Sequence, residues 1–455
     1  MNRIKHFTEE DKKNILRAIK VAWPAVMESF FVAMVSIIDS FMVSQIGSYA
    51  VAAIGLTIQP KFIGLAIFFA INTAVSATVA RRKGEEDRKS ANEVLITSMA
   101  TCLVLTIIIS LVIVILANPI IYIVGSESDT HTEAVTYLRI IMGCMLFNVL
   151  SLVINAAQRG SGNTKIALTT NLVSNTVNVV FNYLLIGGEL GFPKWGVSGA
   201  AIATVLGTVA GCSMSIASLF RKDSYVSIPY MIDKIIKPRW DVLRSMTAFI
   251  SNVFVEQIML RVGFLLASML TAKLGTQSLA INQVGMNLMT LSFAFGDGLQ
   301  VAAITLIGQS LGQRKPENAI KYGKICQGIG LGISIILGII YMAAGKWYYN
   351  MYFPEDVESV RIGYHLCLLA IIAILFQISQ VVYTGSLRAA GDVRFTTIVS
   401  TISVAIVRPI IGFLLAYVLG FGIYGIWIGM LVDQFIRLVS NACRFRSGKW
   451  MNIKD

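Results

Sequence analysis

Long apolar segments separated by short polar breaks cover most of the chain. A helix that crosses a bilayer needs about 20 mainly apolar residues, and the pattern predicts twelve such segments. Their approximate limits are 21–46, 53–80, 93–118, 136–158, 165–187, 196–220, 246–272, 280–310, 321–345, 361–387, 395–419 and 422–442. The amphipathic stretch Asn14–Lys20 indicates that the first helix starts before its apolar run. We therefore expect an all-α membrane protein with twelve transmembrane helices.

The two halves of the sequence repeat one another at a spacing near 228 residues. Gly84 in RRKGEEDRKSAN matches Gly312 in QSLGQRKPENAI (312 − 84 = 228), and Arg159 matches Arg388 (388 − 159 = 229). Each half contains six predicted helices, so both halves enter the membrane from the same side and the repeat is parallel. Two six-helix bundles of this kind are typical of transporters with a central path that opens to alternate sides. The predicted domains are an N-terminal bundle (1–220), a cytoplasmic linker (221–245) and a C-terminal bundle (246–455).

Composition supports a membrane protein. Hydrophobic residues make up 55% and charged residues 14% of the chain, against about 25% charged residues in soluble domains. These values exclude a disordered chain, a coiled coil and an ordinary soluble enzyme. The net charge is 38 − 25 = +13, but the basic residues are not gathered on one domain, so we expect no nucleic-acid partner.

The positions of the basic residues predict the orientation. They collect in the N-terminal stretch, between residues 81 and 89, in the linker, and between residues 314 and 324. Lys and Arg are enriched on the cytoplasmic side of membrane proteins. We therefore expect a multi-pass protein of the inner or plasma membrane with both termini in the cytoplasm.

No motif predicts an enzyme. The six cysteines are scattered without a CxxC pair, and HExxH and GxSxG motifs are lacking. We expect no metal site and no cofactor. A channel is also disfavoured, because channels more often place rings of charge around a pore built from short subunits.

A carboxylate inside the first predicted helix is the strongest functional candidate. Asp39 lies there, no Lys or Arg lies deep in the helices of the first half, and Lys61 falls at an outer end. A buried carboxylate without a basic partner takes up a proton or binds a cation. The repeat places Ala267 at the matching position (39 + 228), so the fold does not require an acid. The alternative is a structural aspartate that is hydrogen-bonded to neighbouring amides.

The second half carries several intramembrane charges of both signs. A buried ion-pair network that fixes helix packing is at least as good an interpretation as a transport role. These residues are Glu256, Arg261, Asp297, Arg408 and Asp433.

Four asparagines lie on one face of the fifth predicted helix. Asn171, Asn175, Asn178 and Asn182 are separated by 4, 3 and 4 residues, which is a helical spacing. Amides cannot face lipid without a partner, so this face must contact protein or a water-filled cavity. Hydrogen bonding between helices is the alternative for all four. Neighbouring predicted helices add Asn155 and Thr204.

Ordered motifs along nearly the whole chain resemble the multidrug and toxic compound extrusion (MATE) transporters. They are WPAVMESFF, IIDSFMVSQIG, VARRKGEEDRKSAN, AAQRGSGNTK, NVVFNYLLIGG and LRAAGDVR, followed by IVRPI. The resemblance leans toward the bacterial branch that includes the DNA-damage-inducible F proteins. It implies export driven by a proton or sodium gradient.

The resemblance also implies roles for particular residues. In proton-coupled relatives the fifth helix carries Asn and, four residues later, Asp; here Asn178 matches the first position and Asn182 replaces the acid. Asp39 is then the strongly titratable member of the cation-coupling site. Asn178, Asn182 and Thr204 are expected to hydrogen-bond to it or to ligate sodium.

Sodium-coupled relatives imply a second candidate site. They carry one carboxylate on the seventh helix and another on the tenth. Glu256 matches the first, whereas Gln377 stands at the second. Glu256 is therefore a secondary cation-coupling candidate.

The expected function is cation-coupled antiport, with H+ favoured over Na+, that exports amphipathic and often cationic organic compounds. Aromatic and methionine side chains suit such substrates. The substrate-binding candidates are Asp39, Met34, Phe30, Asn155, Asn178 and Tyr183. The alternative is a flippase for lipid-linked saccharides, which requires basic residues that face a cavity; Arg261 and Arg408 are the candidates. We expect a monomer.

Overall fold

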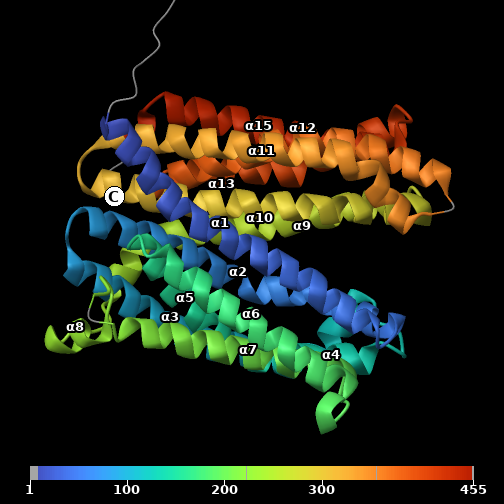
Figure 1. Ribbon diagram of the computed structural model, residues 1–455, viewed down its shortest axis with the longest axis horizontal. Coiled ribbons are helices and arrows are strands. Elements are labelled where there is room, and N and C mark those ends of the chain that lie inside the picture. The colour runs from blue at the N-terminus through green and yellow to red at the C-terminus, as the bar shows by residue number, and fades with distance from the viewer. Residues whose placement is uncertain (1–8, 222, 355, 453–455) are drawn as a thin grey trace, which may run out of the picture. The chain divides into compact units, whose positions relative to one another are not determined.

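The computed structural model describes residues 9–221, 223–354 and 356–452, and these residues form helices and no strands (Figure 1). The first half contains α1 (Glu9–Ser44), α2 (Ser48–Gly84), α3 (Arg88–Val124), α4 (His131–Gly143), α5 (Met145–Gly160), α6 (Thr164–Gly187), η1 (Glu189–Gly191), α7 (Gly196–Leu219) and α8 (Ile228–Asp233). The second half contains α9 (Trp240–Ala272), α10 (Thr276–Gly312), α11 (Pro316–Tyr352), α12 (Val357–Ala389), α13 (Val393–Ile402), η2 (Ser403–Val407), α14 (Arg408–Phe413), η3 (Leu414–Val418), α15 (Gly422–Arg446) and η4 (Lys449–Asn452).

The twelve predicted transmembrane helices are all present. Among the described residues, ten helical segments are long and apolar enough to cross a membrane, and the pair α4–α5, bent by 47°, forms an eleventh. Helix α6 coincides with the predicted segment 165–187 but falls short in hydropathy, because four asparagines interrupt its apolar residues. Several helices are longer than their apolar runs; α2, for example, covers Ser48–Gly84 against the predicted 53–80.

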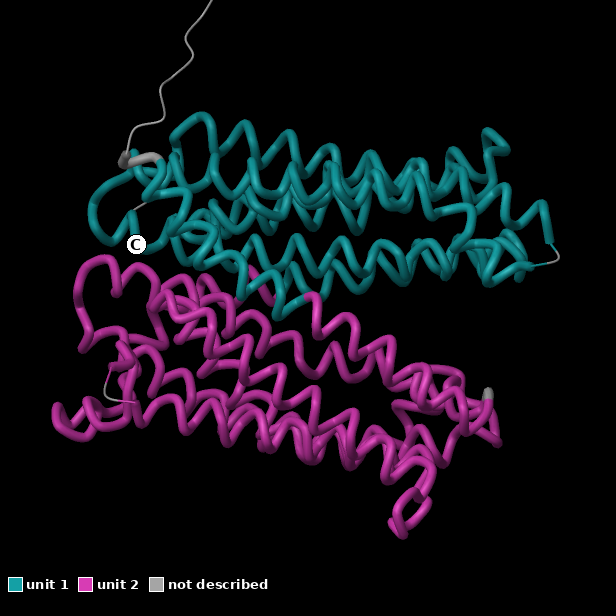
Figure 2. Tube along the Cα trace, viewed as in Figure 1, with its two compact units in different colours: residues 1–29, 255–455 teal, residues 30–254 magenta. Residues whose placement is uncertain are grey.

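The chain forms two compact units (Figure 2). Unit 1 contains residues 1–29 and 255–455, and unit 2 contains residues 30–254. The division therefore falls inside α1 and α9, each of which contributes to both units.

Glycines of α7 bring it close to α6 in unit 2. A Cβ atom at Gly199 would lie 2.5 Å from the Leu185 carbonyl oxygen, and one at Gly207 would lie 2.6 Å from the Ser174 carbonyl oxygen. Only a residue without a side chain permits this approach of the two backbones. The contact places the middle of α7 directly beside Asn178.

The segment between the two repeats is docked on unit 2. Arg88 Nη2 donates to the Ser224 carbonyl oxygen at 2.8 Å, and Arg88 Nε donates to that of Tyr225 at 3.0 Å. The Ser227 backbone N–H donates to Asn92 Oδ1 at 3.0 Å. The start of the predicted linker is thus fixed to the first turns of α3.

Helix α14 in unit 1 lies between two π-helical segments, η2 and η3. Such segments widen the helix and often occur at functional positions. Arg408 is the first residue of α14 and is buried. A glycine again allows close packing, since a Cβ atom at Gly429 of α15 would lie 2.9 Å from the Arg408 carbonyl oxygen.

Candidate functional site

Three helices of unit 2 bring polar side chains together around Asp39. Asp39 lies on α1, Asn178 and Asn182 lie on α6, and Thr204 lies on α7. Asn178 and Asn182 are four residues apart, so both amides lie on one face of α6. The structure therefore joins the four cation-coupling candidates predicted in this half of the chain.

Asn182 makes the direct contact with the carboxylate. Its Nδ2 donates to Asp39 Oδ1 at 2.8 Å. The Asn182 side chain is buried, and its Oδ1 has no hydrogen-bond partner within the described part of the chain. An acceptor oxygen is thus left beside the carboxylate, although a buried polar atom is normally paired.

The Asn178 amide fits the site in one orientation, in which both of its ends meet a suitable partner. Its Nδ2 then donates to Asp39 Oδ1 at 2.8 Å and to Oδ2 at 3.1 Å, and its Oδ1 accepts from the Thr204 backbone N–H at 3.2 Å. The reverse orientation would place the Asn178 oxygen against the Asp39 carboxylate and its nitrogen against the Thr204 N–H. Asp39 therefore accepts hydrogen bonds from two amides, which suits an ionised carboxylate.

The expectation that Asp39 lacks a basic partner in its own bundle was wrong. Lys61 of α2 lies within electrostatic reach of Asp39. Its presence inside the predicted span 53–80 was the available sequence signal, but the approach of α2 to α1 depends on tertiary packing. Tyr137 of α4, a residue without any sequence signal, also lies within electrostatic reach of Asp39 and hydrogen-bonds to Thr204.

A cavity of about 210 Å³ lies beside this cluster in unit 2. Lys61 and Thr204 line it, together with Met142 and Met145. Polar side chains of the Asp39 cluster thus adjoin adaptable apolar walls.

Asn155 belongs to a different polar cluster. Its Oδ1 accepts a hydrogen bond from Ser215 Oγ at 3.2 Å, and its Nδ2 donates to Ser151 Oγ at 3.4 Å. These contacts join α5 to α7, which is the interhelical bonding that membrane bundles use widely.

The apolar substrate candidates have unequal surroundings. Met34 is 41% exposed and Tyr183 is 56% exposed. Phe30 is half-buried, and its ring meets that of Phe31 edge to face at 5.8 Å. None of the three lines the 210 Å³ cavity.

Glu256, the secondary coupling candidate, is part of an ion pair in unit 1. Arg388 Nη2 donates to Glu256 Oε2 at 2.6 Å, and both side chains are buried. Gln377, at the position where sodium-coupled relatives carry an acid, is also buried, and its Oε1 has no hydrogen-bond partner among the described residues. Glu256 is therefore bonded directly to an arginine, Arg388, with which Asp39 forms no such pair.

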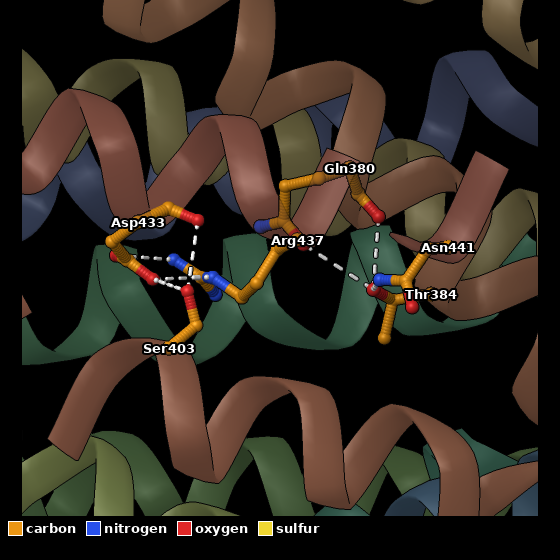
Figure 3. Close-up of polar contacts among 6 residues, drawn as sticks. All are labelled: Gln380, Thr384, Ser403, Asp433, Arg437 and Asn441. Carbon is orange, nitrogen blue, oxygen red and sulfur yellow. Dashed lines mark hydrogen bonds and ion pairs between the residues drawn. The ribbon is translucent and has the colours of Figure 1, made fainter. Parts of the chain in front are cut away.

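A second buried ion pair lies within α15, and a hydrogen bond from Ser403 links it to η2 (Figure 3). Arg437 Nε and Nη2 each donate to Asp433 at 3.0 Å, and Ser403 Oγ donates to Asp433 Oδ1 at 2.8 Å. Figure 3 also shows Asn441 Nδ2 donating to Thr384 Oγ1, at 2.9 Å. These contacts form the packing network that the mixed charges of the second half suggested.

The described residues contain no group of three or more His, Cys, Asp or Glu side chains that could hold a metal ion. The groups described around Asp39 are one carboxylate, two amides, the hydroxyls of Thr204 and Tyr137, and a nearby ammonium group.

Known proteins resemble this chain in sequence and in fold over nearly their whole length. The chain is 25% identical to the probable multidrug resistance protein NorM of Thermotoga maritima, covering 95% of this chain and 92% of the relative. It is 24% identical to the uncharacterized transporter YisQ of Bacillus subtilis, covering 95% and 94%. An outward-facing multidrug resistance MATE family transporter of the MOP superfamily has the same fold, with a TM-score of 0.89 at 17% identity over 97% of this chain and 98% of that chain.

The family profile called MatE matches residues 24–184 and again residues 253–414, once in each half. The two matches agree with the internal repeat and with the twelve helices. The chain belongs to the MatE family, the multidrug and toxic compound extrusion transporters, and is a multi-pass membrane transporter and not an enzyme.

Proposed function

We propose that this transporter is a cation-coupled antiporter that exports amphipathic, often cationic organic compounds by alternating access, with the proton favoured over sodium. The observation that carries the proposal is the contact of the Asp39 carboxylate with the amides of Asn182 and Asn178. Its relatives from Thermotoga maritima and Agrobacterium fabrum are named multidrug resistance proteins, which supports export of drug-like compounds.

Proton uptake by Asp39 changes the hydrogen bonds of the site. Ionised Asp39 accepts hydrogen bonds from the amides of Asn182 and Asn178. After protonation, the carboxyl O–H becomes a donor, so the oxygen that carries it no longer suits an amide N–H and the contact with one of the two amides weakens. Antiport requires that substrate and proton favour different conformations of the protein, and these two bonding patterns supply a local difference between the states.

The neighbouring charge favours the proton over sodium. Lys61 already places a positive charge within electrostatic reach of Asp39, and a compact cation such as Na+ would be repelled more strongly than an organic cation whose charge is spread over a larger volume. A proton neutralises the carboxylate without adding an ion to the site. Oxygen atoms of Asp39, Asn182 and Thr204 would nevertheless suit sodium, a hard cation, so the experiment below includes both gradients.

The substrate is expected to use the same carboxylate. An organic cation and a proton would then compete for Asp39. Met34, Phe30, Asn155, Asn178 and Tyr183 remain the other substrate-binding candidates, and Met142 and Met145 join them because they line the adjacent cavity. We further propose a monomer in the inner or plasma membrane with both termini in the cytoplasm.

A lipid-linked saccharide flippase is the second candidate function. It is favoured by the basic side chains that line cavities, Lys61 in unit 2 and Arg408 in unit 1. Such a protein would move an anionic pyrophosphate lipid and would not couple ethidium to an ion gradient.

The test uses purified protein in liposomes with either a pH gradient, acidic inside, or a sodium gradient. Uptake of ethidium is measured for the wild type, Asp39→Asn and the control Ser40→Ala, whose hydroxyl donates to the Ser36 carbonyl oxygen of its own helix. We expect uptake driven by the pH gradient that Asp39→Asn abolishes and Ser40→Ala retains. Sodium-driven uptake that survives Asp39→Asn but is lost in Glu256→Gln would move coupling to unit 1. Absence of uptake under both gradients would favour the flippase.

A further inference from the structure

A second polar cavity, of about 270 Å³, lies in unit 1 between α9, α10, α14 and α15. Arg408 lines it and is only 6% exposed. The Arg408 Nε has no hydrogen-bond partner within the described ranges. Its guanidinium group stacks over the ring of Phe264, with Cζ 4.7 Å from the ring centroid. A buried guanidinium group with so few partners is unusual, because guanidinium groups normally form several hydrogen bonds.

The charge of Arg408 is not neutralised by the cavity wall. No Asp or Glu is among the residues that line this cavity. Asp433 lies within electrostatic reach of Arg408, but it is already bonded to both Nε and Nη2 of Arg437 and to Ser403 (Figure 3). Two arginines therefore share one carboxylate, which leaves a local charge of +1. Burying an unpaired charge is costly, and an anion in the cavity would remove that cost.

The amides of the cavity wall also offer hydrogen-bond donors. Trp427 Nε1 donates to Asn282 Oδ1 at 3.0 Å, which leaves Asn282 with its Nδ2 donor. Gln283 Nε2 donates to Asn287 Oδ1 at 3.4 Å, which leaves the Nδ2 donor of Asn287. These donors suit a carboxylate in the same cavity as Arg408.

The internal repeat places this cavity at the position of the Asp39 cluster. Asp39 corresponds to Ala267 (267 − 39 = 228), and Ala267 lines the cavity. Tyr-Leu-Leu at 183–185 aligns with Phe-Leu-Leu at 413–415, so Asn178 corresponds to Arg408 (408 − 178 = 230).

The third helix of the cluster gives the same correspondence. The GVSG segment at 196–199 aligns with GIYG at 422–425, so Thr204 corresponds to Met430 (430 − 204 = 226), which also lines the cavity. Equivalent sites of the two repeats thus carry an acid in unit 2, at the position of Ala267, and a base in unit 1, at the position of Asn178.

We propose that the unit 1 cavity binds a small organic anion whose carboxylate pairs with Arg408 and whose flat apolar part packs against Phe264, Trp427 and Met430. Arginine binds a carboxylate with two parallel hydrogen bonds. Sites for drug-sized ligands are about 300–1,000 Å³, so a 270 Å³ cavity suits a compound with a single or fused aromatic ring. The proposal goes beyond cation coupling at Asp39 and holds whichever ion drives transport.

The test measures equilibrium binding of radiolabelled 2-naphthoate to the full-length protein in phosphatidylcholine nanodiscs. We expect saturable binding that unlabelled 2-naphthoate displaces and the uncharged 2-naphthamide does not. Arg408→Gln should weaken binding about ten-fold or more, since a charge-assisted bond contributes about 1.5–3 kcal/mol. Arg408→Lys should recover part of the affinity. Asp39→Asn should bind as the wild type does. Equal displacement by 2-naphthamide, or unchanged affinity of Arg408→Gln, would overturn the proposal.

A second variant separates binding from folding. Ala267→Phe fills the cavity without altering Arg408, and Val262→Phe is its control because Val262 is exposed on the same helix and does not line the cavity. We expect Ala267→Phe to lose 2-naphthoate binding while its thermal midpoint matches that of Val262→Phe. Wild-type binding by a folded Ala267→Phe would contradict the proposal.

Nanodiscs that contain phosphatidylglycerol distinguish a soluble anion from a lipid headgroup. An unchanged 2-naphthoate affinity supports the soluble anion. Competition by the lipid that Arg408→Gln removes would assign the cavity to a headgroup and overturn the assignment made here.

Discussion

The Nδ2 atom of Asn182 lies 2.8 Å from the Oδ1 atom of Asp39, and this hydrogen bond links α6 to α1. It connects the only carboxylate of the cluster to a side chain that cannot itself titrate. Removal of the amide leaves the acid in place, so the contribution of the bond can be measured separately from that of the charge.

We expect Asn182→Leu to reduce gradient-driven ethidium export about ten-fold or more, because a hydrogen bond to a charged group contributes about 1.5–3 kcal/mol. The matched control is Asn175→Leu, on the same helix, whose Nδ2 has no partner in the described structure. Initial rates of export in liposomes provide the measurement. An equal loss in both variants would indicate that the α6 amides act through folding and not through Asp39.

Breaking the Glu256–Arg388 pair should destabilise the protein. Arg388→Met leaves the buried Glu256 without its partner, at a cost of about 3–5 kcal/mol. Glu256→Gln should cost less, because Asp297 still lies within electrostatic reach of Arg388. The double variant removes both charges and should recover much of the lost stability. Thermal unfolding in detergent measures all three. If Glu256→Gln unfolds at the wild-type temperature but loses transport, Glu256 has a functional role that outweighs its structural one.

Gly207→Ala should push α7 away from the coupling cluster. The added Cβ atom would lie 2.6 Å from the Ser174 carbonyl oxygen and 2.9 Å from Asn178 Cβ, and overpacking costs about 1–3 kcal/mol. We expect a lower thermal midpoint together with slower ethidium export. Gly328→Ala on α11 is the control, because a Cβ atom there meets nothing within 4 Å. If Gly207→Ala kept the wild-type thermal midpoint and export rate, α6 and α7 would be able to move apart without affecting the coupling cluster.

A capping bond at the start of α3 should make stability depend on pH. Asp87 Oδ1 accepts the Ser90 backbone N–H at 2.9 Å. Burial opposes ionisation of Asp87, but hydrogen bonds from Ser90 and the charges of Arg82 and Lys89 outweigh it and lower its pKa from 3.8. The stabilisation is therefore present above pH 3.8 and is lost as pH falls through the lowered pKa of the folded protein.

Asp87→Ala should cost about 0.5–1 kcal/mol at neutral pH, a modest value because the site is partly exposed to solvent. The difference in thermal midpoint between Asp87→Ala and the wild type should be smaller in acid, where Asp87 is protonated, than at neutral pH. Thermal unfolding at an acidic and at a neutral pH measures it. The repeat provides the converse variant: Lys315, at the N-cap of α11 (315 − 87 = 228), makes no capping bond, so Lys315→Asp should stabilise that helix. A pH-independent effect of Asp87→Ala would exclude the charged cap.

Cys443 provides a test of orientation. Of the six cysteines, all of which lie in the described residues, Cys443 alone is exposed, and it lies near the end of α15. If the C-terminus is cytoplasmic, a membrane-impermeant maleimide should label the protein in inside-out vesicles and not in right-side-out vesicles. Cys443→Ser should abolish the labelling. Labelling from the outer face would reverse the predicted topology.

The twelve helices and the two repeats could be predicted from the order of residues alone. Hydropathy and helix length are local properties, and a bilayer imposes the same length on every helix that crosses it. The sequence also singled out Asp39, because an acid in an apolar segment is conspicuous whatever its neighbours are. The helical spacing of Asn178 and Asn182 placed both on one face of α6 before any contact was known.

Which side chains meet depends on the packing of the helices and could not be predicted from the residue pattern. Distances between helices depend on their rotation and closeness, which residues such as Gly207 determine. For this reason Lys61 was missed as a neighbour of Asp39, and Asn155 could not be separated from the Asp39 cluster. The cavity at Arg408 could not be predicted for the same reason. Whether Arg408 lines a cavity, and whether an unpaired acid lies beside it, depends on how α9, α10, α14 and α15 pack within unit 1.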